Sequence, residues 1–273
     1  MKSTESLTNH HPFSQADANN LIKILIDPKV ENHDNKLKSL KDLTPINKPT
    51  FKSTLSKSKH LSIIAEIKTK SPSVPKFNVK DLVKQVQEYE ANGAAAISIL
   101  TDEHYFDGSF ERLQNLYSHT TLPILCKDFI IDTIQIDVAK KAGASMILLI
   151  VHCLTDSKLK QLYKYAHKLG LEVLVEVHSI KELQRAHQLN ASLIGINNRD
   201  LTTFNTHVEH TNQILRQKHS GRFYISESGI HSREDVLSIV QTGISGILIG
   251  GALMNCTNIS EFLPSLMLEK VNL

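Results

Sequence analysis

Cysteine is scarce in this chain of 273 residues, which contains only three. Cys126, Cys153 and Cys256 form no CxxC or CxxH motif, so the sequence indicates neither a zinc site nor a disulfide framework. The 14 histidines form no HxH or HExxH pattern, which favours surface and loop roles over metal ligation. We therefore expect no bound metal, and the low cysteine usage favours a reducing cytoplasm.

Neither sign of charge dominates, and long apolar runs are missing. The 31 basic and 28 acidic residues leave a net charge of only +3, and the basic residues are scattered, so no nucleic-acid partner is indicated. Apolar runs such as 146–151 are far too short to cross a bilayer, and residues 1–13 lack the apolar core of a signal peptide. We expect a cytoplasmic protein with no membrane partner.

Short apolar segments rich in β-branched residues alternate with longer amphipathic segments, which is the pattern of βα units. The candidate strands span Ser62–Lys68, Ala95–Leu100, Pro123–Lys127, Ser145–Val151, Glu172–Val177, Leu193–Asn197, Phe223–Glu227 and Gly246–Gly250. The candidate helices span Val79–Ala91, Thr133–Ala142, Ser157–Leu169, Ile180–Leu189, Val208–Gln217 and Arg233–Gln241. Strands begin roughly every 20 to 33 residues, which leaves room for a covering helix after each strand.

An α/β fold of the (β/α)8 type, a closed TIM barrel, explains this repetition best. The alternative, a doubly wound open sheet, usually has a glycine-rich phosphate loop after its first strand, and residues 69–73 contain no glycine. We assign residues 61–273 to a single barrel domain and residues 1–60 to an N-terminal extension packed on it. The extension is expected to contain a helix at Gln15–Ile26 and to cover one end of the barrel. Our hypothesis places it over the catalytic end, where it helps to hold substrate.

Charged and amide side chains occur at the ends of five predicted strands. Alternation along the first strand puts Glu66 and Lys68 on the face opposite Ala65 and Ile67, so the charged pair should point into the barrel. The corresponding residues of later strands are Lys127, Glu176, Asn197 and Glu227. Any one of them alone is as consistent with a structural ion pair, but their convergence at the C-terminal ends of the strands is typical of a barrel active site. Lysines and carboxylates held together shift one another's pKa values, as general acids and bases require.

Small residues follow three of the strands. The residues concerned are Ser71, Gly229, Gly250 and Gly251. The loops after strands 7 and 8, with the N-terminus of a short helix, form the usual phosphate site of such barrels. We therefore expect a phosphorylated small-molecule substrate.

The motifs, read in chain order, resemble those of the indole-3-glycerol phosphate synthase family. They are IIAEIKTKSPS (63–73), SILTDEHYFDGSFERL (98–113), PILCKDFIIDTIQID (123–137), GASMILLIV (143–151), LVEVH (174–178), GINNRDL (195–201), SESGI (226–230) and GILIGGALM (246–254). Other phosphate-binding barrels share an IGG-like turn but not EIK…SPS, KDF and NNRD together. The resemblance runs from about residue 61 to the end of the chain.

The resemblance implies a lyase of tryptophan biosynthesis. Such an enzyme converts 1-(2-carboxyphenylamino)-1-deoxyribulose 5-phosphate into indole-3-glycerol phosphate, with loss of carbon dioxide and water and without a cofactor. It implies that Lys127 protonates the ketone oxygen as the anilino ring carbon attacks, and that Lys68 lies near the substrate carboxylate. Which lysine acts as the acid in each step stays open at this point.

The remaining roles also come from the resemblance. Glu176 resembles the base that completes rearomatisation and dehydration, and Glu66 has a second acid–base role or orients a lysine. Asn197 and Glu227 would orient these groups or the substrate hydroxyls. The rest of the implied pocket consists of Arg199 and Ser228, with Phe106, Phe129 and Leu201 as apolar walls for the aromatic ring.

The chain departs from the family pattern in two loops. Val74-Pro75 replaces the usual Lys-Gly after SPS, which removes a backbone donor and the flexibility of glycine. Gly250-Gly251 stands where relatives have Gly-Ser or Gly-Glu, which removes a possible hydroxyl contact of ~1 kcal/mol. We expect activity to survive both changes.

Two other functions are weighed against this one. Phosphoribosylanthranilate isomerase, another phosphosugar barrel of the same pathway, would use a Cys/Asp pair at its strand ends, whereas the first strand here offers Glu66 and Lys68. A non-catalytic barrel would bind a phosphorylated ligand without turnover. The chain is too short for a fused second barrel, so a monofunctional enzyme is expected, as a monomer or weak homodimer.

Overall fold

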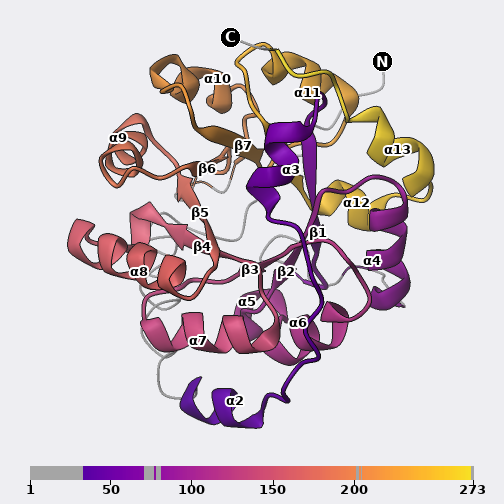
Figure 1. Ribbon diagram of the computed structural model, residues 1–273. Helices are drawn as coiled ribbons and strands as arrows, with labels where there is room; N and C mark the ends of the chain where they lie inside the picture. The colour runs from indigo at the N-terminus through magenta and orange to yellow at the C-terminus, as the bar shows by residue number, and fades with distance from the viewer. Residues whose placement is uncertain (1–32, 71–76, 78–80, 201–202, 204, 272–273) are drawn as a thin grey trace, which may run out of the picture.

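The computed structural model describes residues 33–70, 77, 81–200, 203 and 205–271, and its strands close into a single parallel barrel. The strands follow one another around the barrel in chain order, and β1 pairs with both β2 and β8 (Figure 1). Their bounds are β1 Ser62–Ile67, β2 Ala96–Leu100, β3 Ile124–Lys127, β4 Met146–Ile150, β5 Glu172–Val177, β6 Leu193–Asn197, β7 Phe223–Glu227 and β8 Gly246–Ile249. The predicted α/β barrel is confirmed.

The observed strands lie where the sequence predicts them. The bounds of β5, β6 and β7 match the prediction, and each of the other strands is shorter by one residue at one or both ends. All residues of β2, β4 and β5 are buried, because strands of a parallel barrel are covered on both faces.

Helices surround the barrel and connect the strands (Figure 1). They are α4 Leu82–Ala91, α5 Glu103–Phe106, α6 Phe110–Tyr117, α7 Thr133–Ala142, α8 Asp156–Lys168, α9 Ile180–Gln188, α10 His210–Ile214, α11 Arg233–Val240, α12 Gly251–Asn255 and α13 Ile259–Ser265, with 3₁₀ turns η1 Val151–Cys153 and η2 Leu215–Gln217. Helix α7 has the predicted bounds because Asp132 and Gln135 form a capping box at its start and Gly143, with φ of 103°, ends it. The single helix predicted at 208–217 is instead α10 followed by η2.

The apolar core has two layers, which follow from the alternation of side chains along the strands. Ile63, Ala65 and Cys126 belong to the layer between the strands and the outer helices. The barrel interior is filled by a second cluster, which includes Ile64 and Leu174. Residues that alternate with the outer layer therefore point inward, and at the C-terminal ends of the strands these inward positions are polar.

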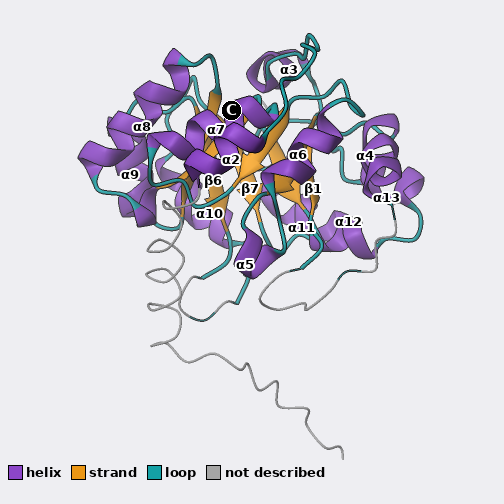
Figure 2. Ribbon diagram, turned by 90° about the horizontal axis from the view of Figure 1, so that it is seen from below, coloured by secondary structure: helices purple, strands orange, loops and turns teal. Residues whose placement is uncertain are grey.

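Two helices precede the barrel. Helix α2 (His33–Ser39) packs beside α7, and α3 (Phe51–Lys57) packs Phe51 and Leu55 into the interior cluster. Figure 2 shows α3 at the opposite end of the strands from α5 and α12, which follow the C-terminal ends of β2 and β8. Residues 51–57 thus cover the N-terminal end of the barrel. That the extension as a whole reaches the catalytic end stays a prediction, because residues 1–32 lie outside the described residues. The helix predicted at residues 15–26 lies outside the described residues.

Helix α3 is fixed to the barrel by a buried carboxylate at the start of β5. Glu172 accepts hydrogen bonds from the backbone N–H groups of Phe51 and Lys52, the latter at 3.0 Å. These groups have no partner inside the helix, so Glu172 satisfies them and complements the positive end of the helix dipole.

Replacing Glu172 with alanine is expected to lower the free energy of unfolding by about 2 kcal/mol, because one buried and one partly buried N–H group lose a charged acceptor. Urea denaturation followed by circular dichroism measures the change. Glu111→Ala, at an exposed position of α6, is the control and should leave the stability within about 0.5 kcal/mol of the parent. An equal effect of the two substitutions would show that the α3 contact contributes nothing specific.

Candidate active site

A network of charged side chains occupies the C-terminal ends of β1, β3 and β7. The carboxylate of Glu66 lies with Oε1 2.9 Å from Lys68 Nζ and with Oε2 3.0 Å from Lys127 Nζ. Lys127 Nζ also lies 3.6 Å from Oε2 of Glu227. The sequence placed these four residues at strand ends, and the structure brings them into contact.

Two glycines leave the space that the carboxylates occupy. A Cβ atom on Gly195 would lie 2.0 Å from Glu227 Oε1, and one on Gly250 would lie 2.3 Å from Glu66 Oε1. Any larger residue at either position would displace a carboxylate of the network. Gly250 was expected at the phosphate site, and its observed neighbour is Glu66. Gly195 was not among the candidates. It lies on β6 and pairs in register with Ile225 of β7, two residues before Glu227.

The charges of this network set its protonation states. Burial raises the pKa of Glu66, but Lys127 and Lys68 outweigh burial and hold the pKa at about 2. Burial lowers the pKa of Lys127, but Glu66, Glu227 and Glu176 outweigh burial and raise it above its usual value. Lys127 is therefore a charged donor and Glu66 a charged acceptor at neutral pH.

Glu227 behaves differently from Glu66. Its side chain is 0% exposed, and within the described part of the chain neither of its carboxylate oxygens has a hydrogen-bond partner. Burial, with the negative charge of Glu176, raises the pKa of Glu227 to about 8 despite the attraction of Lys127. Glu66 and Glu227, which both contact Lys127, thus differ in protonation near neutral pH, as acid–base catalysis requires.

The raised pKa of Glu227 predicts a pH-dependent stability. In the folded protein the pKa of Glu227 is about 8, against an ordinary value of 4.5. The contribution of this group to the free energy of unfolding is therefore fully present below pH 4.5 and is lost as the pH rises through 8. Compared with Glu227→Gln, the native protein should lose at least about 1.4 kcal/mol of unfolding free energy between pH 5 and pH 8, the equivalent of one pKa unit. Urea denaturation at several pH values measures this difference. A constant difference would contradict the assignment.

Glu176 and Asn197 complete the ring of polar strand ends. Glu176 is buried at the end of β5 and close enough to act electrostatically on Lys127 and Glu227. Asn197 pairs in register with Glu227, and its Oδ1 accepts a hydrogen bond from the backbone N–H of Arg199 at 3.0 Å. Burial lowers the pKa of Arg199, and the charge of Glu66 acts in the opposite direction, which places the guanidinium near the network.

Aromatic side chains lie beside the charged residues. The rings of Phe106 and Phe129 are 6.5 Å apart with an interplanar angle of 31°. Asp102 positions Phe106 by capping α5, since its Oδ1 accepts from the N–H of Phe106. Phe77, which was not among the candidates, places its ring centroid 5.6 Å from Lys68 Nζ. Leu201 and Ser71 lie outside the described residues.

The sequence profile described as indole-3-glycerol phosphate synthase matches residues 23–266. Proteins named indole-3-glycerol phosphate synthase from Staphylococcus haemolyticus, Staphylococcus saprophyticus and Staphylococcus aureus are 61%, 58% and 59% identical. Each alignment covers 88% of this chain and 92% of the relative.

The chain belongs to the indole-3-glycerol phosphate synthase family. The protein is therefore an enzyme of tryptophan biosynthesis, a decarboxylating lyase that acts on a phosphorylated small molecule. Among solved structures, a thiamine phosphate pyrophosphorylase from Pyrococcus furiosus aligns with a TM-score of 0.58 and 18% identity, over 76% of this chain and 93% of that one. This likeness concerns the barrel fold alone.

The loops after β6 and β7 of this synthase-family chain are held together by Asn198. Its Nδ2 donates to Ser226 Oγ at 3.0 Å and to the Ser228 carbonyl at 3.1 Å, and its Oδ1 accepts from the side chain of Thr211. Ser228 and Gly229 both have positive φ, at 66° and 78°. A side chain on Gly229 would therefore be strained and would also crowd Thr206.

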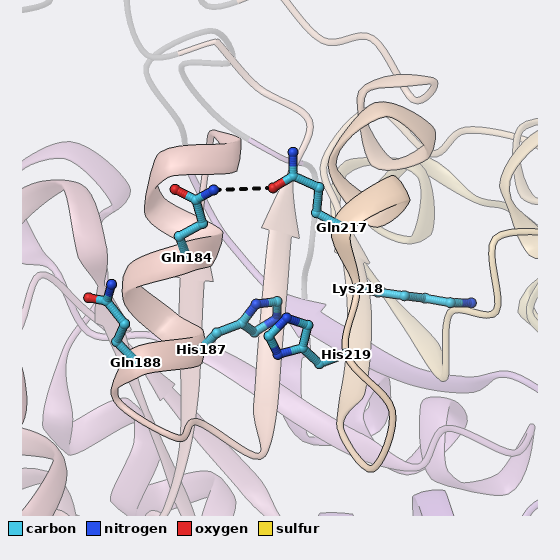
Figure 3. A pocket seen from close by; sticks show the side chains of 6 residues that line it. All are labelled: Gln184, His187, Gln188, Gln217, Lys218 and His219. Carbon is cyan, nitrogen blue, oxygen red and sulfur yellow. Dashed lines mark hydrogen bonds between the residues drawn. The ribbon is translucent and has the colours of Figure 1, made fainter.

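A separate pocket of about 550 Å³ lies between α9 and residues 217–219, where the imidazoles of His187 and His219 stack with centroids 3.8 Å apart (Figure 3). Burial, with the charges of His219 and Arg222, lowers the pKa of His187 to about 4. Figure 3 shows Lys218 directed away from the imidazoles. None of the predicted site residues lines this pocket.

Two further findings concern the described residues. Within the part of the chain that the structure describes, no helix is both long and apolar enough to cross a membrane. The same residues contain no cluster of three or more His, Cys, Asp or Glu side chains arranged to hold a metal ion.

Proposed function

We propose that the charged network closes the indole ring of 1-(2-carboxyphenylamino)-1-deoxyribulose 5-phosphate, giving indole-3-glycerol phosphate, carbon dioxide and water without a cofactor. The main support is the Lys127 ammonium, which lies 3.0 Å from Glu66 and 3.6 Å from Glu227. The substrate carries a ketone, a carboxylate and a phosphate, so its site needs an acid for the ketone and cations or donors for the anions. The network offers both at one face of the barrel.

Lys127 is the proposed acid for carbon–carbon bond formation. As the anilino ring carbon attacks the ketone carbon, the carbonyl π electrons move onto oxygen, which takes the Lys127 proton. The amine that remains lies beside Glu227, whose pKa of about 8 keeps a proton available near neutral pH. Glu227 can therefore return a proton to Lys127 before the next step.

Decarboxylation and dehydration then complete the indole. The electrons of the bond to the departing carbon dioxide restore the aromatic ring, and Lys68, held by Glu66, is the cation nearest to the carboxylate before it leaves. The hydroxyl group leaves as water with a second proton from the network, and Glu176 removes the carbon-bound proton that completes the new double bond. Since two protons are delivered and one is removed, each turnover takes up one proton from solvent.

The neutral parts of the site would bind the rest of the substrate. The rings of Phe106 and Phe129 provide apolar walls for the anilino ring, together with Leu201. Arg199, Ser228 and Asn197 would contact the carboxylate and the hydroxyl groups. This part of the proposal rests on position at the strand ends and on the family resemblance.

The phosphate would lie at the loops after β7 and β8, with Ser71 from the loop after β1. Gly251 begins α12, and the free N–H groups of a first helical turn attract anions. Gly229 and Gly250 keep the neighbouring backbone free of side chains. The close contact of Gly250 with Glu66 means that this glycine would serve the carboxylate network as well as the phosphate.

The test of this function is a metal-free turnover assay. Purified full-length protein is mixed with the anilino-deoxyribulose phosphate in the presence of a chelator, and indole formation is followed by absorbance and fluorescence. The proposal predicts sustained turnover with stoichiometric release of carbon dioxide. Binding without turnover would favour the non-catalytic barrel, and dependence on added metal would contradict cofactor-free chemistry.

The same proposal includes a cytoplasmic enzyme that works as a monomer or weak homodimer. Cys126, Cys153 and Cys256 form no disulfide bond in the described part of the chain, which agrees with a reducing compartment. Sedimentation at concentrations used for the assay tests the oligomeric state, and a stable larger assembly would contradict it.

A further inference from the structure

A chain of alternating carboxylate and imidazole groups runs outward from Glu176. Glu176 Oε1 lies 3.3 Å from His178 Nε2, and Nδ1 of the same imidazole lies 3.4 Å from Glu182 Oε2. These are contacts at ion-pair distance, since neither ring nitrogen of His178 has a hydrogen-bond partner within the described residues. The other oxygen of Glu182 lies 3.1 Å from His152 Nδ1. The chain connects β5, α9 and η1, and it leads from a buried carboxylate to a half-exposed imidazole.

Glu182 is fixed more firmly than a surface carboxylate would be. Its Oε2 accepts a hydrogen bond from the backbone N–H of His178 at 2.8 Å, and its own N–H is bonded to Ser179 Oγ. Burial raises the pKa of Glu182, but the hydrogen bonds from His152 and His178 outweigh burial and hold the pKa at about 2. Glu182 is therefore a charged anchor whose position is set by backbone groups.

The charged and titratable groups around His178 come from several elements. Glu176 and Glu182 face its two ring nitrogens, and the His152 ring lies 6.3 Å away in an edge-on arrangement. His210 of α10 contacts the His178 carbonyl through Nε2 at 2.9 Å. Arg185 of α9 bonds the carbonyl groups of Val151 and Leu154, which holds η1 against α9.

We propose that His178 is a positioning residue that orients the Glu176 carboxylate for proton removal, with Glu182 as the anchor of the imidazole. This inference rests on the proposed role of Glu176 as a base. A base must lie within hydrogen-bond reach of the proton that it removes, and a third group commonly fixes its orientation. Without this contact the Glu176 carboxylate could turn away from the productive orientation, and a misplacement of about 1 Å lowers a rate by up to about a hundredfold.

Sequence reasoning had assigned His178 to a surface or loop role, and the structure shows why this was incomplete. Glu176 and His178 are two residues apart, so the alternation along a strand places both side chains on the same side. His178 lies one residue beyond the end of β5, where that alternation still holds. Glu182 lies four residues further, within the first turn of α9, and so reaches back to the imidazole.

The test compares His178→Leu, His178→Gln and Glu182→Gln with the parent enzyme. His178→Leu should lower kcat at least about tenfold and change KM less than about threefold, because orientation of the base, not substrate binding, is lost. His178→Gln keeps an N–H donor and should recover part of kcat. Glu182→Gln should lower kcat by a smaller factor. His167→Leu, an exposed histidine on α8, is the control and should leave both constants unchanged.

The decisive comparison uses Glu176→Gln as a background. If His178 acts through Glu176, then adding His178→Gln or Glu182→Gln to Glu176→Gln should change kcat less than about twofold. The same loss in both backgrounds would show a merely structural role and overturn the inference. Near-normal kcat for Glu176→Gln alone would instead refute the proposed role of Glu176. If His178→Leu does not fold, the two glutamine variants carry the test.

Discussion

Replacing Lys127 with alanine is expected to lower kcat at least about a hundredfold, the usual scale for a positioned acid. The substitution removes the ammonium that lies between Glu66 and Glu227, and no other cation lies within 4 Å of Glu227 in the described part of the chain. Lys68 remains paired with Glu66 but has no contact with Glu227. In the proposed mechanism, loss of Lys127 leaves the ketone oxygen without its charged donor.

Steady-state kinetics measures the change in kcat, and circular dichroism checks that the variant is folded. Lys158→Ala is a matched control, since it removes a lysine 3.4 Å from Asp132 on the outside of the barrel. It should leave kcat within about twofold of the parent. A Lys127→Ala variant that folds and keeps near-normal kcat would remove Lys127 from the role of acid.

Glu176→Gln is expected to lower kcat by a similar factor of about a hundred, with little effect on folding. The amide keeps the shape of the carboxylate but cannot accept the carbon-bound proton during dehydration. It also removes a negative charge that raises the pKa of Glu227, so the loss cannot come from greater repulsion in the network.

The matched control is Glu209→Gln, at an exposed position before α10. Rates measured from pH 5 to pH 9 distinguish the loss of a base from a shift in the pKa of another group of the network. A Glu176→Gln variant with an unchanged kcat across this range would contradict the assignment. A loss of substrate affinity without loss of kcat would assign Glu176 to binding.

The barrel and the network at its strand ends could be predicted because both depend on periodicity. Eight apolar runs set the number of strands, and alternation along β1 placed Glu66 inward and Ala65 outward, as observed. Converging strand ends then bring distant residues together without any further information. The motifs of the family resemblance supplied the chemistry that periodicity cannot give.

Contacts between segments that are far apart in the sequence could not be predicted from periodicity. Nothing in the sequence of residues 51–57 selects one end of the barrel, whereas the packing of Phe51 and Leu55 into the interior cluster and the contact of Glu172 with the start of α3 select the N-terminal end. The role of Gly195 depends on the Glu227 side chain of the neighbouring strand. Likewise, His178 becomes significant only when Glu182 is seen beside it.

The most direct test of the account is a single-turnover experiment with substrate labelled in the carboxyl carbon, in which carbon dioxide and indole are measured separately. In the proposed mechanism, bond formation precedes loss of carbon dioxide, and dehydration follows it. We predict that Lys127→Ala releases neither product, whereas Glu176→Gln releases carbon dioxide in excess of indole. Release of carbon dioxide by Lys127→Ala at the parent rate, or equal formation of both products by Glu176→Gln, would contradict the proposed order of acid and base.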